Sequence, residues 1–199
     1  MSDAHRRKKQ PDVLRPQLLQ SASQLAIEEG LASVTLDAVA SRAGVSKGGL
    51  QHHFPNKQAL LDALFAEAVA AFNADIAAAS AADADAGAHA NADDKGRAAR
   101  AYIQATVQEP KKEGPASYLH LLLAVMLTDA DARERWSAQI AEITRPDPLP
   151  EAQAARLMIC RLAADGLWIA QLLGYQSMGP SLKAEVLRQL DQMTRGLEQ

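Results

Sequence analysis

The apolar positions in the first third of the chain recur every three or four residues, which is the spacing of amphipathic helices. The first predicted helix begins around Pro16, a residue suited to an opening turn, and ends at Gly30. Its apolar stripe consists of Leu18, Leu19, Ala22, Leu25 and Ala26. Further on, Pro55 blocks helical continuation and Asn56 can cap a long helix. The apolar side of that helix consists of Leu60, Leu61, Leu64, Phe65, Ala68, Val69 and Phe72.

Two short helices joined by a tight turn are predicted between these longer ones. Thr35 can cap the first, which turns Leu36, Val39 and Ala40 inward. Gly44 supplies the left-handed residue that ends it. Ser46 then caps a helix from Lys47 to about His53, in which Leu50 is the single apolar anchor. Two short helices joined by a turn that contains Gly form the arrangement that places a recognition helix in the major groove of DNA.

The rest of the chain predicts four or five more helices, over residues 97–108, 115–128, 130–144, 150–175 and 181–197. The near-continuous apolarity of 115–128 predicts burial on most sides, whereas 130–144 is amphipathic around Trp136. Residues 79–96 are rich in Ala and Asp and lack large apolar side chains, which indicates a loop or a frayed helix end. No segment alternates with the period of a strand, so the predicted fold class is all-α.

The last two predicted helices carry more apolar surface than one neighbour can cover. In 181–197 a single stripe is formed by Leu182, Val186, Leu190, Met193 and Leu197. The helix before it has two apolar faces. One consists of Leu157, Ala164, Trp168, Leu172 and Tyr175, and the other of Ile159, Leu162, Gly166, Ile169 and Leu173. A second copy of the chain is the economical partner for the additional face, and packing within one protomer is the alternative.

The composition fits a helical protein of the cytoplasm. The 199 residues are 48% hydrophobic and only 4% aromatic, with Ala and Leu dominant, which favours helix over sheet. The single cysteine, Cys160, excludes an intramolecular disulfide and fits a reducing compartment. No run of 18 apolar residues and no signal peptide occur, so we predict a cytoplasmic protein without a membrane partner.

The net charge of −3 is unevenly distributed along the chain. Residues 1–57 hold eight Lys and Arg against five Asp and Glu, a net charge of +3, which leaves −6 for the remainder. A basic end on an acidic body is expected where one end meets nucleic acid, although ordinary scatter can also give this imbalance. Within a polar tail, residues 1–13, lies the basic run from His5 to Lys9. Two interpretations stay open: an arm that binds DNA, and a solvated tail.

The residues from Leu18 to Leu64 resemble the N-terminal domain of the TetR family of transcriptional regulators. The resemblance is most specific in AGVSKGGL, HF and NK at residues 43–50, 53–54 and 56–57, and it includes Ala26-Ile27-Glu28-Glu29-Gly30. A looser likeness lies at 163–168. The resemblance to the TetR family implies three parts of the chain. These are a flexible basic tail (1–13), a three-helix helix-turn-helix DNA-binding domain (14–57) and a C-terminal helical domain that binds a ligand and dimerises (58–199). The expected function is a ligand-responsive repressor that binds a palindromic, double-stranded operator as a homodimer through its last two helices.

Carried over by position, the resemblance implies DNA contacts by Thr35, Ser46, Lys47, Gly48, Gly49, Gln51, His52, His53 and Lys57. Lys47 can donate to guanine and Gln51 can pair with adenine, while His53, Lys57 and Thr35 are better placed for phosphate. Leu50 and Phe54 are expected in the core. Family members usually carry a tyrosine at one of the positions 51 and 52, where this chain has Gln51 and His52, so the operator of a relative does not transfer. For the histidines, a solvated pair with one ring against the helix is the alternative.

The body implied by the resemblance would bind a small molecule. Candidate pocket residues are Tyr102, Tyr118, His120, Met126, Trp136, Met158, Arg161 and Trp168. They suggest a mainly apolar effector, with His120 or Arg161 to orient a polar or acidic group. Each of these residues can equally serve packing, and Arg161 can instead pair with Asp165, one turn further along.

Two other classes of function compete with a regulator. The chain has no nucleophile elbow, P-loop or zinc-protease motif, and Cys160 lies in an apolar run, so we predict no enzyme and no catalytic residue. No metal-ligand spacing recurs, and His89 and the nearby aspartates do not supply one, so neither a metal nor another cofactor is predicted. A helical scaffold is supported only by the apolar faces of the last two helices. Repressor and activator stay open from the residues alone.

Overall fold

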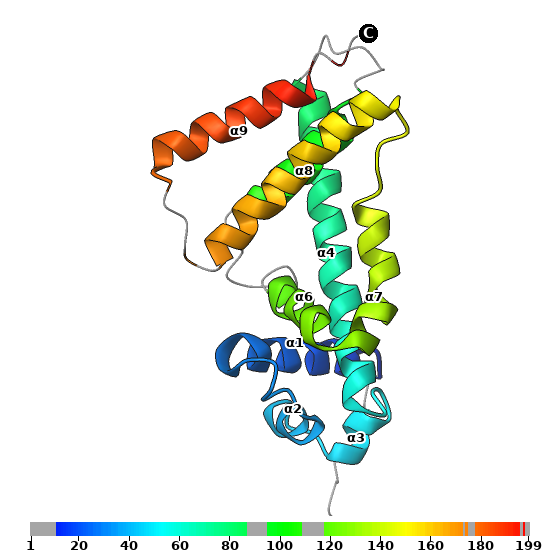
Figure 1. Cartoon of the computed structure of the whole chain (residues 1–199). Helices are drawn as coiled ribbons and strands as arrows, with labels where there is room; N and C mark the ends of the chain where they lie inside the picture. Colours follow the sequence, from blue (N-terminus) through cyan, green and yellow to red (C-terminus); the bar gives the residue numbers. More distant parts are fainter. Residues whose placement is uncertain are drawn as a thin grey trace, which may run out of the picture. The chain divides into compact units, whose positions relative to one another are not determined.

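The computed structural model describes residues 11–86, 95–108, 118–172, 174, 178–195 and 197, and the regular structure within them is helical (Figure 1). The helices are α1 (Pro11–Glu29), α2 (Leu36–Arg42), α3 (Lys47–Gln51), α4 (Lys57–Ala86), α5 (Arg97–Val107), α6 (Leu119–Thr128), α7 (Ala130–Ile143), α8 (Glu151–Leu172) and α9 (Pro180–Thr194). The predicted all-α fold is confirmed. Within these residues, none of the helices is both long and apolar enough to cross a membrane.

Several helix boundaries differ from those predicted, and three of the differences concern whole turns. α1 begins at Pro11 rather than Pro16, and Pro16 lies in its second turn, where it forgoes one backbone hydrogen bond. α4 continues to Ala86, through part of the stretch predicted as a loop. Alanine is the strongest helix former, and it needs no apolar stripe to extend a helix that is already nucleated. α9 ends at Thr194, although Leu197 beyond it is still buried.

The chain divides into two compact units, and the first consists of residues 1–69 and 111–136. The buried side chains from α1 to the start of α4 include Leu18, Ala22, Val39, Leu50, Phe54, Leu60, Leu64 and Phe65. Trp136 of α7 stacks on Phe65, with ring centroids 4.4 Å apart. Its indole N–H donates to Oδ1 of Asp62 at 2.7 Å, so the buried polar atom of this large side chain has a partner.

Helix α6, in the same unit, is less buried than its composition predicts. Leu122 is fully buried, whereas Leu127 is 82% exposed. The side chains between them are mostly half-buried. The prediction of burial on most sides was therefore wrong: Leu122 is the fully buried residue of α6, Leu119, Leu121 and Leu123 are half-buried, and Leu127 lies at the surface.

The second unit consists of residues 70–110 and 137–199, and α5, α8 and α9 pack together in it (Figure 1). Its main apolar cluster contains Ile103, Cys160, Ala164, Leu167 and Leu190, with Val186 and Met193 against it. Val186, Leu190 and Met193 of the predicted stripe of the last helix thus face the core, whereas Leu182 of the same stripe is exposed. Burial raises the pKa of the Cys160 thiol, which keeps it in the unreactive protonated form.

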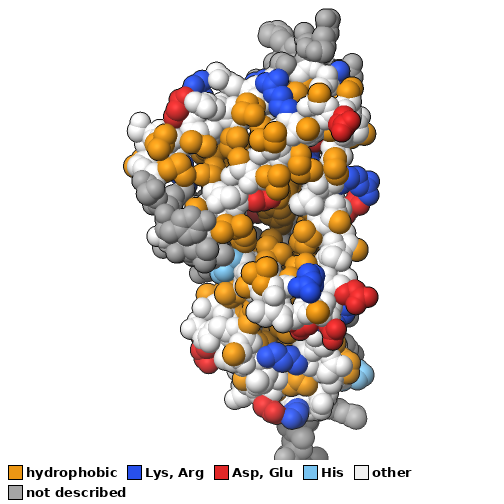
Figure 2. All heavy atoms as spheres, in the orientation of Figure 1, with side chains coloured by type: hydrophobic (Ala, Val, Ile, Leu, Met, Phe, Trp, Pro, Cys, Tyr) orange, Lys and Arg blue, Asp and Glu red, His pale blue; other side chains and the backbone are white. Residues whose placement is uncertain are grey.

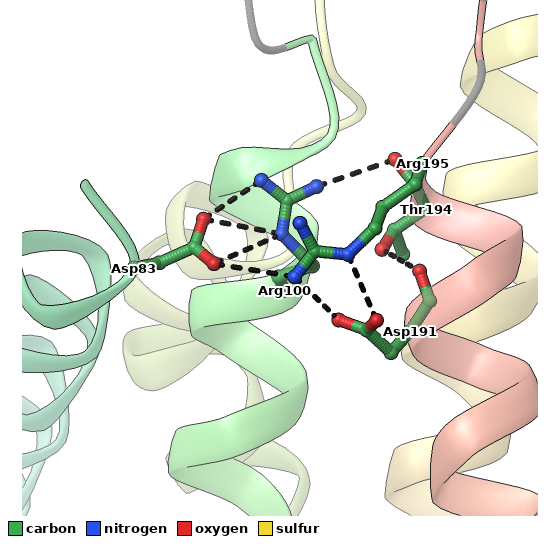
Figure 3. A network of polar contacts seen from close by, with 5 residues as sticks. All are labelled: Asp83, Arg100, Asp191, Thr194 and Arg195. Atoms are coloured by element: carbon green, nitrogen blue, oxygen red, sulfur yellow. Dashed lines mark hydrogen bonds and ion pairs between the residues drawn. The ribbon is translucent and has the colours of Figure 1, made fainter. Parts of the chain in front are cut away.

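A network of charges fastens the end of α4 to α5 and to the end of α9 (Figure 3). The buried guanidinium of Arg100 donates to Asp83, with Nη2 2.7 Å from Oδ2. Arg195 lies 3.5 Å from Asp83 and donates from Nε to Oδ2 of Asp191 at 2.8 Å. The Arg100 guanidinium lowers the pKa of the Asp83 carboxyl. The helical stretch predicted as a loop therefore carries one of the anchors of this unit.

The two predicted faces of α8 are confirmed by their burial. Leu157 and Ala164 are fully buried, whereas Ile159 is 57% and Leu162 61% exposed, and Ile169 of the same face is 41% exposed. Leu172, Leu173 and Tyr175 lie outside the described side chains. In Figure 2, hydrophobic side chains gather on the surface over α8 and α9. Among the described residues, this face of α8 therefore stays apolar and exposed, and Leu182 of α9 is exposed as well.

Candidate nucleic-acid interface

The two short helices of the first unit are set by caps and a glycine turn. Oγ1 of Thr35 accepts from the backbone N–H of Ala38 at 3.2 Å, and Oγ of Ser46 accepts from that of Gly49 at 3.1 Å. Gly44 lies between the helices with φ of 67°, a conformation that favours glycine. Both caps were predicted, and both are confirmed. Because these hydroxyls serve as caps, they hold the starts of α2 and α3 in place.

Helix α3 turns one side chain inward and leaves the others at the surface. Leu50 is fully buried, as predicted, while Gln51 and His52 are exposed. His53 is half-buried and lies edge-on to His52, with ring centroids 5.4 Å apart. A Cβ built on Gly48 would meet nothing within 4 Å. This position has an open surface on which a larger molecule can approach the backbone.

Two of the cations near α3 are paired with carboxylates from α1 and α2. Nζ of Lys47 donates to Oδ2 of Asp37 at 2.9 Å. Arg42 at the end of α2 forms an ion pair with Glu28 and has its Nη1 3.9 Å from Glu29. No part in the interface was predicted for Asp37, because ten residues separate it from Lys47 and no local spacing rule connects them.

The other two cations of the described segment 11–57 are also engaged. Nζ of Lys57 donates to the carbonyl of Leu31 at 3.3 Å, which ties the start of α4 to the loop after α1. The guanidinium of Arg15 lies 5.3 Å from the centroid of the Phe54 ring, a cation–π contact. Asn56 caps α4 as predicted, because its Oδ1 accepts from the N–H of Ala59 at 2.8 Å.

The eight candidate effector-site residues divide between the two units. Tyr118, His120, Met126 and Trp136 lie in the first unit, and Tyr102, Met158, Arg161 and Trp168 in the second. In the first unit, the hydroxyl of Tyr118 donates to Glu67 at 3.0 Å, so both of its large aromatic candidates are bonded to carboxylates of α4. Burial lowers the pKa of His120, which favours the neutral ring.

In the second unit the structure brings Tyr102 and Arg161 into contact. The Arg161 guanidinium lies 5.6 Å from the centroid of the Tyr102 ring, and Phe72 lies edge-on to the same ring. Arg161 pairs with Asp147 at 3.0 Å and donates to the carbonyl of Arg145. The alternative of a direct Arg161–Asp165 ion pair is not what the structure has.

Asp165, predicted from the sequence only as an alternative partner for Arg161, is bonded to Tyr102 instead. The Tyr102 hydroxyl donates to its Oδ1 at 2.8 Å. Burial raises the pKa of the Asp165 carboxyl, and burial together with the nearby carboxylate raises that of Tyr102. No spacing rule in the sequence connects these two residues, which lie 63 positions apart.

Comparison with known proteins agrees with this architecture. Residues 18–64 match the family model of bacterial regulatory proteins of the tetR family, and residues 96–195 match that of the tetracyclin repressor-like C-terminal domain. The HTH-type transcriptional regulator BetI of Stenotrophomonas maltophilia (strain R551-3) is 27% identical over 181 residues, which cover 82% of this chain and 84% of that protein. The transposon Tn10 TetC protein of Escherichia coli is 37% identical over 59 residues, 30% of each chain.

Solved structures share the fold at low identity. The protein SCO7518 of Streptomyces coelicolor A3(2), described as a candidate transcriptional regulator, has a TM-score of 0.59 and 20% identity over 92% of this chain and 99% of its own. The multidrug binding protein EbrR, solved with imidazole, has a TM-score of 0.54 and 22% identity over 88% of this chain and 93% of its own.

The fold and the surface around α3 define a helical DNA-binding protein with a helix-turn-helix. With the two family models matched in sequence order, the chain belongs to the TetR family of transcriptional regulators.

Proposed function

We propose that this protein is a ligand-responsive repressor that binds a palindromic operator as a homodimer. In this proposal the DNA contacts come from residues 14–57, and residues 58–199 bind the effector and dimerise. The observation that carries it is the surface of α3, where Lys47, Gly48, Gln51 and His52 are exposed around the buried anchor Leu50. The exposed side of such a helix can enter a major groove, while the buried Leu50 on its other side packs it into the domain.

The homodimer is supported by the uncovered apolar face of α8. Ile159, Leu162 and Ile169 are large apolar side chains on one side of a helix whose other side is buried. Contiguous exposed apolar patches of this kind mark interaction sites in soluble proteins. A two-fold dimer pairs this face with itself and presents two α3 helices, so the expected operator is a palindrome whose half-site spacing matches their separation.

The proposed effector is small and mainly apolar, and its polar group is oriented by Asp165 rather than Arg161. Arg161 is already neutralised by Asp147, so it does not require an acidic ligand. Asp165 receives one hydrogen bond, from Tyr102, in aromatic surroundings that include Phe72. EbrR, which shares the fold, is a multidrug binding protein, and BetI is a transcriptional regulator. These two relatives are consistent with regulation by a small molecule.

The test is footprinting of the purified protein across the intergenic DNA upstream of its own gene, at several salt concentrations, followed by transcription from that fragment in vitro. A protected palindrome, with binding that weakens steeply as salt rises and with reduced transcription, is the expected result. Increased transcription would show that the protein acts as an activator and not as a repressor. If a folded dimer protects no DNA at low salt, a genome-wide pull-down distinguishes a distant operator from a protein that does not bind DNA.

A further inference from the structure

Asp165 of α8 is a half-buried carboxylate of the second unit, and its capacity for hydrogen bonds is only partly used. Its Oδ1 accepts from the hydroxyl of Tyr102 at 2.8 Å. Among the described residues, this is the one hydrogen bond to the carboxylate, which leaves Oδ2 without a donor. The two oxygens of an ionised carboxylate can together accept about four hydrogen bonds. Asp165 can therefore bind a further donor that the described residues do not supply.

The charges around Tyr102 do not balance. The guanidinium of Arg161 lies 5.6 Å from the centroid of the Tyr102 ring, and its positive charge also acts on Asp165. Arg161 pairs with Asp147 at 3.0 Å, and both of these side chains are buried. One guanidinium thus lies among two carboxylates, however its charge is shared between them. Among the described residues, this cluster keeps one negative charge when both carboxylates are ionised.

Burial makes this negative charge costly. It raises the pKa of the Asp165 carboxyl, although the hydrogen bond from Tyr102 and the charge of Arg161 oppose the rise. Charges inside proteins are ordinarily paired, because an unpaired charge that has lost water is strongly destabilising. Carboxylates that burial and specific neighbours perturb in this way are enriched at functional sites. The arrangement therefore favours a positively charged partner that binds at Asp165.

Aromatic side chains lie beside this carboxylate. The ring of Phe72 is edge-on to that of Tyr102, with ring centroids 5.9 Å apart. Phe72, Tyr102 and Asp165 belong to α4, α5 and α8, so residues from three helices of the second unit meet at this cluster. Aromatic rings attract organic cations as well as apolar groups. A ligand with a positive charge on an apolar body fits both parts of the cluster.

We propose that Asp165 binds the ammonium group of a protonated amine, and that the effector of this protein is an amine with an apolar or aromatic body. The inference rests on the proposed regulation by a small molecule and specifies its chemical class. A charge-assisted hydrogen bond from the ammonium group to Oδ2 neutralises the remaining negative charge. The apolar body lies against Tyr102 and Phe72. A carboxylate ligand is disfavoured, because it adds a second unpaired negative charge.

The experiment measures the binding of phenethylammonium, its neutral counterpart phenethyl alcohol and the anion phenylacetate to the full-length protein by calorimetry. Asp165→Asn removes the charge of the side chain and nearly keeps its shape. Glu151→Gln makes the same change in net charge at an exposed position in the first turn of α8, so it is the matched control. Circular dichroism checks that both variants are folded.

The parent protein and the Glu151→Gln control should bind phenethylammonium at least about tenfold more tightly than either of the other probes. In Asp165→Asn this preference should fall to within about twofold. A preference that persists in Asp165→Asn would assign the cation to another group and overturn the proposal. Equal binding of the alcohol, tighter binding of phenylacetate, or no binding of the amine by the parent protein overturns it as well.

A second measurement does not depend on a probe. Because the folded pKa of Asp165 is raised, its ionised form lowers the stability of the free protein once the pH is above about 4. Asp165→Asn should therefore unfold at the same temperature as the parent protein or at a higher one at neutral pH. A lower unfolding temperature would show that the carboxylate is satisfied within the fold, and it would overturn the proposal.

Operator binding, measured with each probe, separates this inference from the proposed function. If phenethylammonium binds through Asp165 but leaves operator binding unchanged, the amine site is supported and its regulatory role is overturned. If phenethyl alcohol weakens operator binding as strongly as the amine does, and Asp165→Asn does not alter the response, regulation by a small molecule stands and the amine class is wrong. If the parent protein binds no DNA, the proposed function fails, while calorimetry still decides whether Asp165 binds the amine.

Discussion

Gly48 and Gly49 are adjacent in α3, but their surroundings differ. A Cβ on Gly49 would lie 3.3 Å from Oγ of the capping Ser46, whereas one on Gly48 would meet nothing within 4 Å. Glycine at position 48 is therefore not required by the fold of this chain. Its absence of a side chain becomes useful only when another molecule lies against α3.

We expect Gly48→Ala to leave the protein folded and to raise its stability by about 0.5 kcal/mol, because alanine is the better helix former. The same methyl group should weaken operator binding about tenfold or more, which corresponds to about 1.4 kcal/mol. Thermal unfolding and operator affinity, measured on the same preparation, check the two parts. Parent-like affinity would mean that Gly48 lies outside the interface.

At the same scale, Asp83→Asn tests the charge network of Figure 3. Removal of the carboxylate leaves the buried Arg100 without its main partner, and at neutral pH it should cost about 2 to 4 kcal/mol of unfolding free energy. The pKa of Asp83 in the folded protein is below its ordinary value of 3.8. Its contribution is therefore present above about pH 4 and is lost as the pH falls through the folded pKa.

Denaturant unfolding of both proteins between about pH 7 and pH 3 measures this difference. The gap in unfolding free energy should narrow as the pH falls below about 4. A gap that stays constant with pH would assign the loss to packing rather than to charge.

Residue-scale prediction worked where the chemistry is local. The caps by Thr35, Ser46 and Asn56 each join a side chain to an N–H three residues ahead, so a short stretch of sequence contains both partners. Asp83 and Arg100 are 17 positions apart, and only the packing of α4 against α5 brings them together. Arg161 was paired with its near neighbour in one interpretation, while the structure pairs it with Asp147, on the loop before α8.

At the scale of the elements, the residue before α5 lies against the end of α9. A Cβ on Gly96 would lie 1.9 Å from the backbone oxygen of Thr194, so neither side-chain rotation nor local adjustment relieves the clash. Gly96→Ala is expected to destabilise the protein by about 1 to 3 kcal/mol, because one of the two segments has to move. Thermal unfolding measures the loss, and Gly48→Ala is the matched control in open space.

The hydrophobic periodicity of a helix predicted the side that is buried. It predicted less well how much of the helix is buried. On α8 the apolar residues at two phases of the 3.6-residue period separate into a buried and an exposed face, as expected. On α6 nearly all positions are apolar. Polar residues therefore do not mark the exposed face, and the sequence does not show that Leu127 lies on it. The end of α4 was missed because its anchor is charged, and hydrophobic periodicity does not register an ion pair.

For the whole molecule, the dimer proposal leads to a prediction about Leu162. A carboxylate in the centre of a face that pairs with itself would meet its own copy across the two-fold axis, and both would lose water. Leu162→Glu is therefore expected to give monomers in sedimentation analysis and to lower operator affinity. Leu127→Glu, at an exposed leucine on α6, is the control and should remain dimeric. If both variants sediment like the parent, another surface makes the dimer.

The burial of Cys160 has a practical consequence for studying regulation. It is the only cysteine of the chain, it is fully buried, and its thiol is held in the protonated form. A maleimide or a spin label should therefore not react with Cys160 in the folded protein. Cys160 then does not have to be replaced before a new cysteine is introduced for labelling. With Leu127→Cys, a homodimer would carry two labels related by symmetry, and a single interlabel distance would report whether an effector or an operator moves the DNA-binding units.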